Sequence, residues 1–110
     1  MSEATEARFA ELETLAQQFA TAQAQAEHLS EFRKSKKALL MREAELQGVK
    51  TAAIQEREAY AHADYVALLH GLKAATEQAL SCKWRLEIAR MRFEWARTKA
   101  ATRRAEMNLR

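Results

Sequence analysis

Proline is absent from this 110-residue sequence, and glycine occurs only at Gly48 and Gly71. These two residue types mark most turns and loops, so the chain contains little sequence from which loops can be built. Catalytic residues lie disproportionately on loops that a rigid scaffold holds in place. The scarcity of loop residues therefore argues against most classes of enzyme.

Strand-favouring residues and cysteine are also scarce. Valine and isoleucine occur twice each, whereas the abundant residues (Ala, Glu, Lys, Arg, Gln and Leu) are strong helix formers. The single cysteine, Cys82, excludes a disulfide within the chain and fits a reducing compartment. No apolar run approaches the roughly 20 residues that span a bilayer, and the acidic N-terminal residues are unlike a signal peptide. We therefore expect an all-α protein of the cytoplasm that makes no membrane contact.

Two long segments carry the 3-4 apolar spacing of a coiled-coil seam. In the first segment the seam residues are Leu12, Leu15, Phe19, Ala22, Ala26 and Leu29. The pattern then shifts, as at a stutter, and resumes at Phe32, Leu39, Leu40 and Ala44. In the last segment the alternation is unbroken through Tyr65, Leu68, Leu72, Ala75, Ala79, Cys82, Leu86, Ala89, Phe93, Ala96 and Ala100.

Capping residues predict where the helices begin and end. Ser2 can cap the start of the first helix, Gly48 suits the position after its end, and Asp64 is a good N-cap for the last helix. The predicted elements are a helix over 3–47, a connecting helix over 50–61 and a helix over 64–108. A short connection places the long helices antiparallel. The prediction is thus a single domain, residues 1–110, folded as a long coiled-coil-like helical hairpin that assembles into a helical bundle.

The similar lengths of the two long helices predict the register between them. The expected neighbours are Phe19 with Phe93, Leu12 with Ala100 and Leu40 with Leu72. Charge favours the same arrangement, because residues 1–32 have six acidic groups against Arg8 alone, whereas residues 81–110 have nine basic groups against three acidic ones. An acidic helix facing a basic one biases the topology toward this pairing.

A second apolar stripe lies opposite the seam of the last helix when residues advance by roughly 100° each. Its members are Leu69, Leu80, Trp84, Ile88, Met91 and Trp95. A two-helix hairpin covers one face of each helix, and contiguous apolar patches are rarely left in water. The stripe is either the core of a homodimer or higher homo-oligomer, or is partly covered by the connecting helix near Leu69. Alternatively its tryptophans anchor a different protein or stack on nucleic acid.

Two groups of basic residues are candidates for binding nucleic acid or an acidic partner. The first is Arg33, Lys34, Lys36 and Lys37, which has no acidic run opposite it and is the better candidate for a free basic patch. The second is Arg85, Arg90, Arg92, Arg97, Lys99, Arg103 and Arg104, interleaved with aromatic residues. Basic tracks with aromatic platforms favour single-stranded DNA. The alternative is that these side chains solvate the bundle or pair with the acidic first helix.

Residues suited to catalysis or metal binding form no convincing constellation. Cys82 lies on the seam and is interpreted as a small buried hydrophobe. The three histidines, His28, His62 and His70, are scattered, and the sequence has no second cysteine for zinc. There is no glycine-rich phosphate loop or nucleophile elbow. We predict no catalytic residue, no metal, no cofactor and no small-molecule substrate.

The segments AYAHADYVALLHGLKAATEQA and KWRLEIARMRFEWARTKAATRR give the chain a family resemblance. Residues 58–104 resemble small helical proteins that phages and prophages encode, often among DNA replication and recombination genes. The distinctive parts are Tyr60, Tyr65 and the stretches around Trp84 and Trp95. The resemblance implies a phage accessory role in the cytoplasm of the host cell.

The leading hypothesis is a non-enzymatic phage or prophage accessory protein. It would self-associate and bind nucleic acid or a recombination or DNA-metabolism protein. One alternative is a phage-encoded inhibitor or adaptor of a host nuclease or defence complex, which would use a helical surface and need no pocket. Another is a purely structural oligomerisation module.

Overall fold

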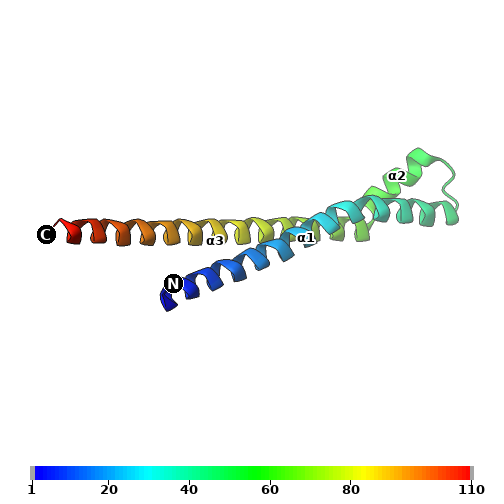
Figure 1. Ribbon diagram of the computed structural model, residues 1–110. Helices are drawn as coiled ribbons and strands as arrows, with labels where there is room; N and C mark the ends of the chain where they lie inside the picture. Colours follow the sequence, from blue (N-terminus) through cyan, green and yellow to red (C-terminus); the bar gives the residue numbers. More distant parts are fainter. Residues whose placement is uncertain (1, 110) are drawn as a thin grey trace. The chain divides into compact units, whose positions relative to one another are not determined.

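The computed structural model describes residues 2–109 and contains three α-helices (Figure 1). They are α1 (Glu3–Leu46), α2 (Ala52–Ala61) and α3 (Ala63–Asn108). The described residues contain no strand, so the predicted all-α class is confirmed. The helix bounds differ from those predicted by at most two residues. No helix within residues 2–109 is both long enough and apolar enough to cross a membrane.

The ends of α1 carry the caps that the sequence predicts. The Thr5 backbone N–H donates a hydrogen bond to Ser2 Oγ over 3.2 Å. At the other end Gly48 adopts a φ of 101°, a conformation that glycine alone adopts without strain. The Val49 N–H then donates to the Ala44 carbonyl over 3.0 Å, as in a Schellman motif.

The junction between α2 and α3 is capped by a residue that the prediction passed over. Asp64 was predicted as the N-cap of α3, and this is wrong, because Asp64 lies in the first turn. The cap is His62, whose Nδ1 accepts the Asp64 backbone N–H over 3.0 Å. The unprotonated nitrogen of a neutral imidazole can accept a backbone hydrogen bond, as a capping oxygen does. Capping preferences list Ser, Thr, Asp and Asn and so do not point to histidine.

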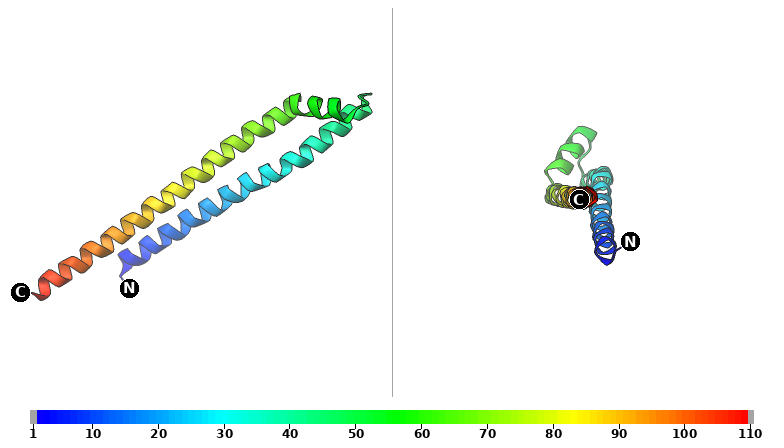
Figure 2. Two further views of the ribbon diagram at one scale, coloured as in Figure 1. Left: turned by 90° about the horizontal axis from the view of Figure 1, so that it is seen from above. Right: turned by 60° about the vertical axis from the view of Figure 1, so that its left-hand side comes forward.

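The internal contacts divide the chain into two compact units. We call residues 21–79 the hinge unit, and residues 2–20 with 80–109 the paired unit. Each unit holds a segment of α1 that runs antiparallel to a segment of α3 (Figure 2). The predicted antiparallel hairpin is therefore confirmed.

The hinge unit is built on a small core where the three helices meet. Leu40, Ala59 and Tyr65 are buried together, one from each helix, with Met41 packed against them. Ala59 is only 1% exposed, so α2 approaches α1 as closely as an alanine allows. The Tyr60 and Tyr65 rings meet edge to face, with centroids 5.3 Å apart.

The predicted register between α1 and α3 is wrong in both units. Phe93 lies against Phe9 rather than Phe19, with ring centroids 4.8 Å apart. Leu12 shares a groove with Ala89 rather than Ala100. In the hinge unit, Leu40 packs against Tyr65 rather than Leu72.

In the hinge unit the register is shifted because α2 folds back along the end of α1 instead of merely bridging to α3. Lys37 of α1 contacts Glu56 of α2 over 3.2 Å, and Lys36 lies 3.9 Å from Asp64 at the start of α3. The last helix therefore begins level with Lys36 and not with the end of α1. In the paired unit, α3 extends beyond the N-terminal end of α1 (Figure 2), so the predicted seam residue Ala100 is exposed.

Most of the predicted seam is otherwise covered. Its buried members are Ala26, Leu40, Ala44, Tyr65, Ala79, Cys82 and Phe93. The predicted shift does not occur directly after Leu29 in the pattern of burial but at Leu40 and Ala44, which are buried four residues apart. Phe32 and Leu39, which were expected to resume the seam, are exposed. Lys36 is half-buried instead, seven residues after Leu29 and four before Leu40, so it lies on the same face as both.

Candidate interaction surfaces of the third helix

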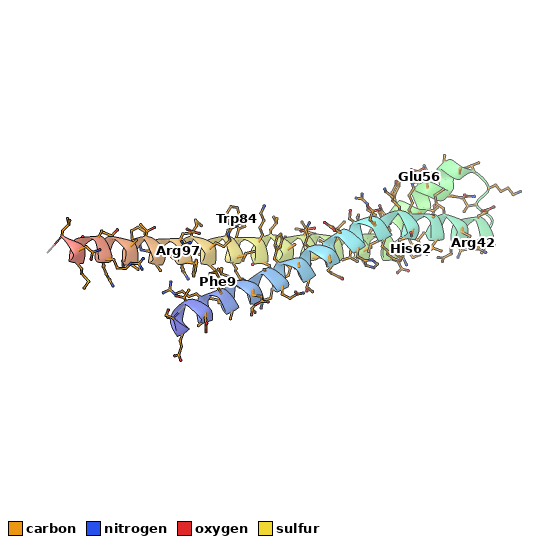
Figure 3. The ribbon with its side chains drawn as sticks, viewed as in Figure 1. Phe9, Arg42, Glu56, His62, Trp84 and Arg97 are labelled. Carbon is orange, nitrogen blue, oxygen red and sulfur yellow. The ribbon has the colours of Figure 1, made fainter. Side chains whose placement is uncertain are left out.

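The apolar stripe of α3 in the paired unit is exposed along its whole length. We call its members Leu80, Trp84, Ile88, Met91 and Trp95 the tryptophan stripe. Trp84 is 58% exposed and Trp95 is 65% exposed. Figure 3 shows Trp84 on the side of α3 that faces away from α1. Pairing with α1 therefore covers only the opposite face of the helix.

Leu69, the sixth predicted member of the stripe, lies in the hinge unit. It is also exposed, so α2 does not bury it. This removes the expectation that the connecting helix covers this end of the stripe. The use of all six residues as an interface stays a prediction.

Basic residues follow the two edges of the α3 seam with a period of seven. Along one edge are Lys83, Arg90, Arg97 and Arg104, which we call the first basic ridge. Along the other are Arg85, Arg92 and Lys99, the second basic ridge, with Arg103 one turn further on. A repeat of seven keeps residues in line along a helix that pairs with another, so each set forms a row. Glu87, the only acidic residue between Arg85 and Arg92, lies on the side of the first ridge and pairs with Arg90.

In the paired unit, α1 forms no ion pair with either basic ridge of α3. Within residues 2–20 and 80–109, the structure holds no ion pair between α1 and α3; the only one is Arg90 with Glu87, 3.4 Å apart inside α3. The acidic segment of α1 nevertheless lies beside the basic segment of α3, as the charge pattern predicts. At roughly 100° per residue, Glu11 and Glu13 flank the α1 seam on its two sides, whereas Glu3 points away from it. Glu11 shares a groove with Arg92 but forms no ion pair with it.

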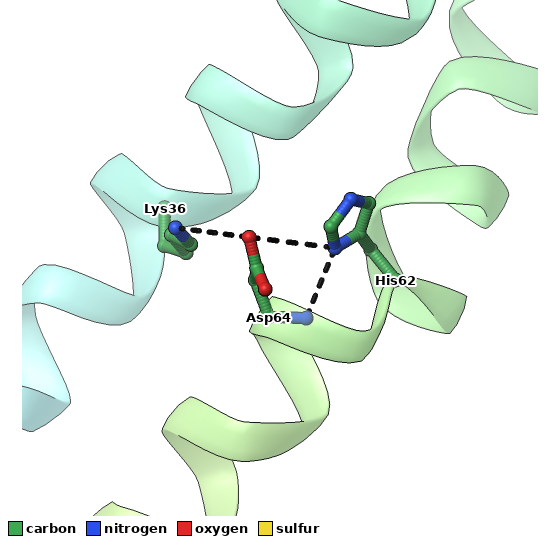
Figure 4. A network of polar contacts seen from close by, with 3 residues as sticks. All are labelled: Lys36, His62 and Asp64. Carbon is green, nitrogen blue, oxygen red and sulfur yellow. Dashed lines mark hydrogen bonds and ion pairs between the residues drawn. The ribbon is translucent and has the colours of Figure 1, made fainter.

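The basic cluster in the middle of α1 is not the free patch that the sequence suggested. Lys36 lies 3.9 Å from Asp64 Oδ2, which is also near His62 (Figure 4). The Lys37 Nζ contacts Glu56 over 3.2 Å and lies 4.9 Å from the Tyr60 ring centroid. Hydrogen bonding to Tyr60 and then to Glu56 raises the pKa of Lys37.

Only Arg33 and Lys34 of that cluster point freely into solvent, both being exposed. Lys36 and Lys37 are half-buried and join α1 to the other two helices. Their first role is therefore to hold the hinge unit together. Among the predicted basic residues, those of α3 are the stronger candidates for binding an anionic partner.

The tryptophan stripe and the basic residues meet at one point. Lys99 of the second basic ridge lies with its Nζ 5.9 Å from the centroid of the Trp95 ring. A shallow groove nearby is lined by Glu87, Arg90, Met91, Glu94, Trp95 and Thr98. The surface thus offers apolar, acidic and basic groups side by side, which suits another macromolecule.

No metal centre emerges from the described residues. Within residues 2–109, no three side chains of His, Cys, Asp or Glu converge as ligands would. His62 and Asp64 approach to 3.9 Å, but His70 does not join them. Cys82 is buried on the seam.

The period of seven in the basic residues was present in the sequence and could have been detected there. Counting charge over a segment does not reveal it, because a sum ignores position. By contrast, the contacts of Lys36 and Lys37 could not be detected, since they depend on how α2 folds back.

No protein-family model, curated protein or solved structure matches the chain.

Proposed function

We propose that this chain is a non-enzymatic phage or prophage accessory protein that self-associates and binds nucleic acid. The two activities use different surfaces of the same helix. The tryptophan stripe associates with other protein, and the basic ridges bind phosphates. The resemblance of residues 58–104 to phage-encoded helical proteins supplies the biological setting of this proposal.

The observation that carries the nucleic-acid part is the exposure of the basic ridges without acidic partners from α1. Residues 80–109 contain eight basic side chains against three acidic ones. Members of a ridge are seven residues apart, or about 10.5 Å along the helix at 1.5 Å per residue. Rows of arginine and lysine that neutralise phosphates release counterions, and this release drives sequence-independent binding.

Fluorescence anisotropy of labelled oligonucleotides tests the proposal. Single-stranded and double-stranded DNA of equal length would be titrated with protein over a series of salt concentrations. We expect binding at low salt that weakens steadily as salt rises. The triple variant Arg85→Gln, Arg92→Gln, Lys99→Gln should lower the slope of log K against log salt by about 2 on single strands, from a slope of about 0.7 per phosphate contact.

A matched control distinguishes DNA binding by the basic ridges from attraction by the overall positive charge of the chain. The double variant Arg33→Gln, Lys34→Gln removes exposed basic residues of the hinge unit and should leave the slope nearly unchanged. An equal loss in both variants would mean that charge alone, without the ridges, attracts the DNA. No binding of either DNA at low salt would overturn the nucleic-acid part.

Exposure of the tryptophan stripe also favours a second candidate function, that of an inhibitor or adaptor which docks on a host nuclease or defence complex. Tryptophan is enriched among the residues that dominate binding energy at interfaces. In that case Trp95→Ala would abolish the activity against the host complex, whereas neutralising the second basic ridge would not.

A further inference from the structure

The chain exposes more surface than a compact protein of its mass. The accessible surface is 8617 Å². A folded monomer of 12.6 kDa is expected to expose about 6,200 Å². The excess is larger than the roughly 800 Å² that each partner contributes to a standard protein interface. The chain therefore has surplus surface for an interface of standard size, which would cover about a third of the excess.

The order of side chains in the tryptophan stripe favours a second copy running in the opposite direction. With Ile88 near the centre, antiparallel packing sets Trp84 beside Met91 of the second copy and Trp95 beside Leu80 of the second copy. Each bulky indole then meets an aliphatic side chain, as interdigitated packing requires. Parallel packing would instead set each tryptophan against its own counterpart.

We infer that two copies form an antiparallel dimer through the tryptophan stripe, which places the second basic ridges of both copies on one face. This inference rests on the self-association in the proposed function and specifies its geometry. In a two-fold antiparallel pair, each flank of the stripe faces the same flank of the other copy. The two flanks of the dimer therefore differ in charge.

On the flank toward the first basic ridge, acids and bases alternate. There Glu87 comes level with Arg90 of the second copy, and Glu94 comes level with Lys83 of the second copy. Opposite charges at such positions select the orientation of paired helices. The flank is thus complementary to itself when reversed.

On the other flank, Arg85 comes level with Arg92 of the second copy, and no acid of the stripe intervenes. Like charges across this flank repel, and a bound polyanion removes that repulsion. The dimer would therefore present one continuous basic face to nucleic acid. A short oligonucleotide should tighten the dimer rather than compete with it.

Disulfide cross-linking in a Cys82→Ala background tests the geometry without nucleic acid. Ile88→Cys lies near the two-fold axis and should cross-link to itself. Leu80→Cys should not, because the two copies of residue 80 would be about 24 Å apart along the helices, at 1.5 Å per residue. Disulfides need Cα atoms within about 7 Å. Cross-linking of both variants would show a parallel dimer and overturn the inference.

Sedimentation equilibrium separates this inference from the proposed function. Trp95→Ala should weaken the dimer at least ten-fold, while Leu39→Ala, which changes an exposed apolar residue of the hinge unit, should leave it unchanged. Circular dichroism would verify that both variants remain helical. A wild-type monomer at all concentrations would overturn the dimer. DNA binding is measured separately, so either part can fail while the other holds.

Discussion

The hinge unit and the paired unit use the same two helices but are held together differently. In the hinge unit, three helices meet around Leu40, Ala59 and Tyr65, and the ion pairs of Lys36 and Lys37 join them. In the paired unit, two helices meet along a seam whose one aromatic contact in the described residues is Phe9 with Phe93. There no ion pair links the helices, and the tryptophan stripe stays uncovered.

The difference shows where polar groups are used for folding and where they remain for binding. In the hinge unit Lys36 and Lys37 contact Asp64 and Glu56, so these two lysines position α2 and α3. In the paired unit the basic side chains lack such partners on α1 and face solvent. The hinge unit therefore uses these polar groups to position its own three helices, and the paired unit presents the candidate surfaces.

The largest effect is expected from a cavity in the hinge unit. Leu40→Ala removes a buried side chain from the contact of three helices and should cost about 2–5 kcal/mol. Leu39→Ala, the adjacent and exposed leucine, should cost less than about 0.5 kcal/mol. Urea unfolding followed by circular dichroism measures both. Equal losses would mean that the core of the hinge unit lies elsewhere.

A smaller loss of stability is expected when a buried side chain is removed from the seam of the paired unit. Phe93→Ala should cost about 2 kcal/mol, at the low end for a buried phenylalanine, because the half-exposed Phe9 can move into the space. Trp84→Ala on the opposite face should cost less than about 0.5 kcal/mol at concentrations where the chain is monomeric. Urea midpoints at high dilution test the pair. A reversed order would place the seam on the wrong face of α3.

Substitution by alanine should change the stability of the chain in opposite directions at the two glycines. Gly48→Ala forces a side chain into the positive-φ position and should cost about 1–2 kcal/mol. Gly71→Ala lies inside α3, where an added Cβ meets nothing within 4 Å, and should stabilise the chain by about 0.5–1 kcal/mol. Thermal unfolding of the two variants compares them. Destabilisation by both would indicate an unseen neighbour at Gly71.

The smallest effect concerns the pH dependence of the hinge unit. Because contacts with Tyr60 and Glu56 raise the pKa of Lys37, the folded state holds this proton more tightly than the unfolded chain. The stabilisation is fully present below 10.5, the ordinary lysine value, and is lost as the pH rises through the raised pKa. The difference in urea midpoint between wild type and Lys37→Met should vanish over that range.

A double-mutant cycle controls this measurement. Adding Glu56→Gln to Lys37→Met should change the urea midpoint less than Glu56→Gln does in the wild type, since the two side chains interact. Additive losses would show that the ion pair does not contribute.

The helices and their ends were predictable because they depend on local chemistry. The cap at Ser2 and the turn at Gly48 follow from backbone hydrogen bonding within a few residues. The exposed face of Trp84 and Trp95 follows from helical periodicity. Their exposure required one further assumption, that α1 covers a single face of α3, and the structure agrees with it.

The register and the state of the basic residues were not predictable in the same way. The prediction assumed that the connecting helix only bridges the long ones, whereas α2 lies back along α1. In the hinge unit this difference brought Lys36 and Lys37 to acidic partners, and in the paired unit Phe93 lies beside Phe9 rather than Phe19. In the paired unit the acidic segment of α1 lies beside the arginines of α3 as expected, but no ion pair joins the two helices there.

The sequence alone thus determined an all-α chain, the positions of its breaks and the two apolar faces of α3, because helical periodicity and capping act over a few residues. Only the tertiary structure decided which turn of α1 lies beside which turn of α3. Seams rich in alanine offer many pairings of similar energy. In the hinge unit the pairing is fixed by the close packing of Ala59 against Leu40 and Tyr65, and in the paired unit by the contact of Phe9 with Phe93.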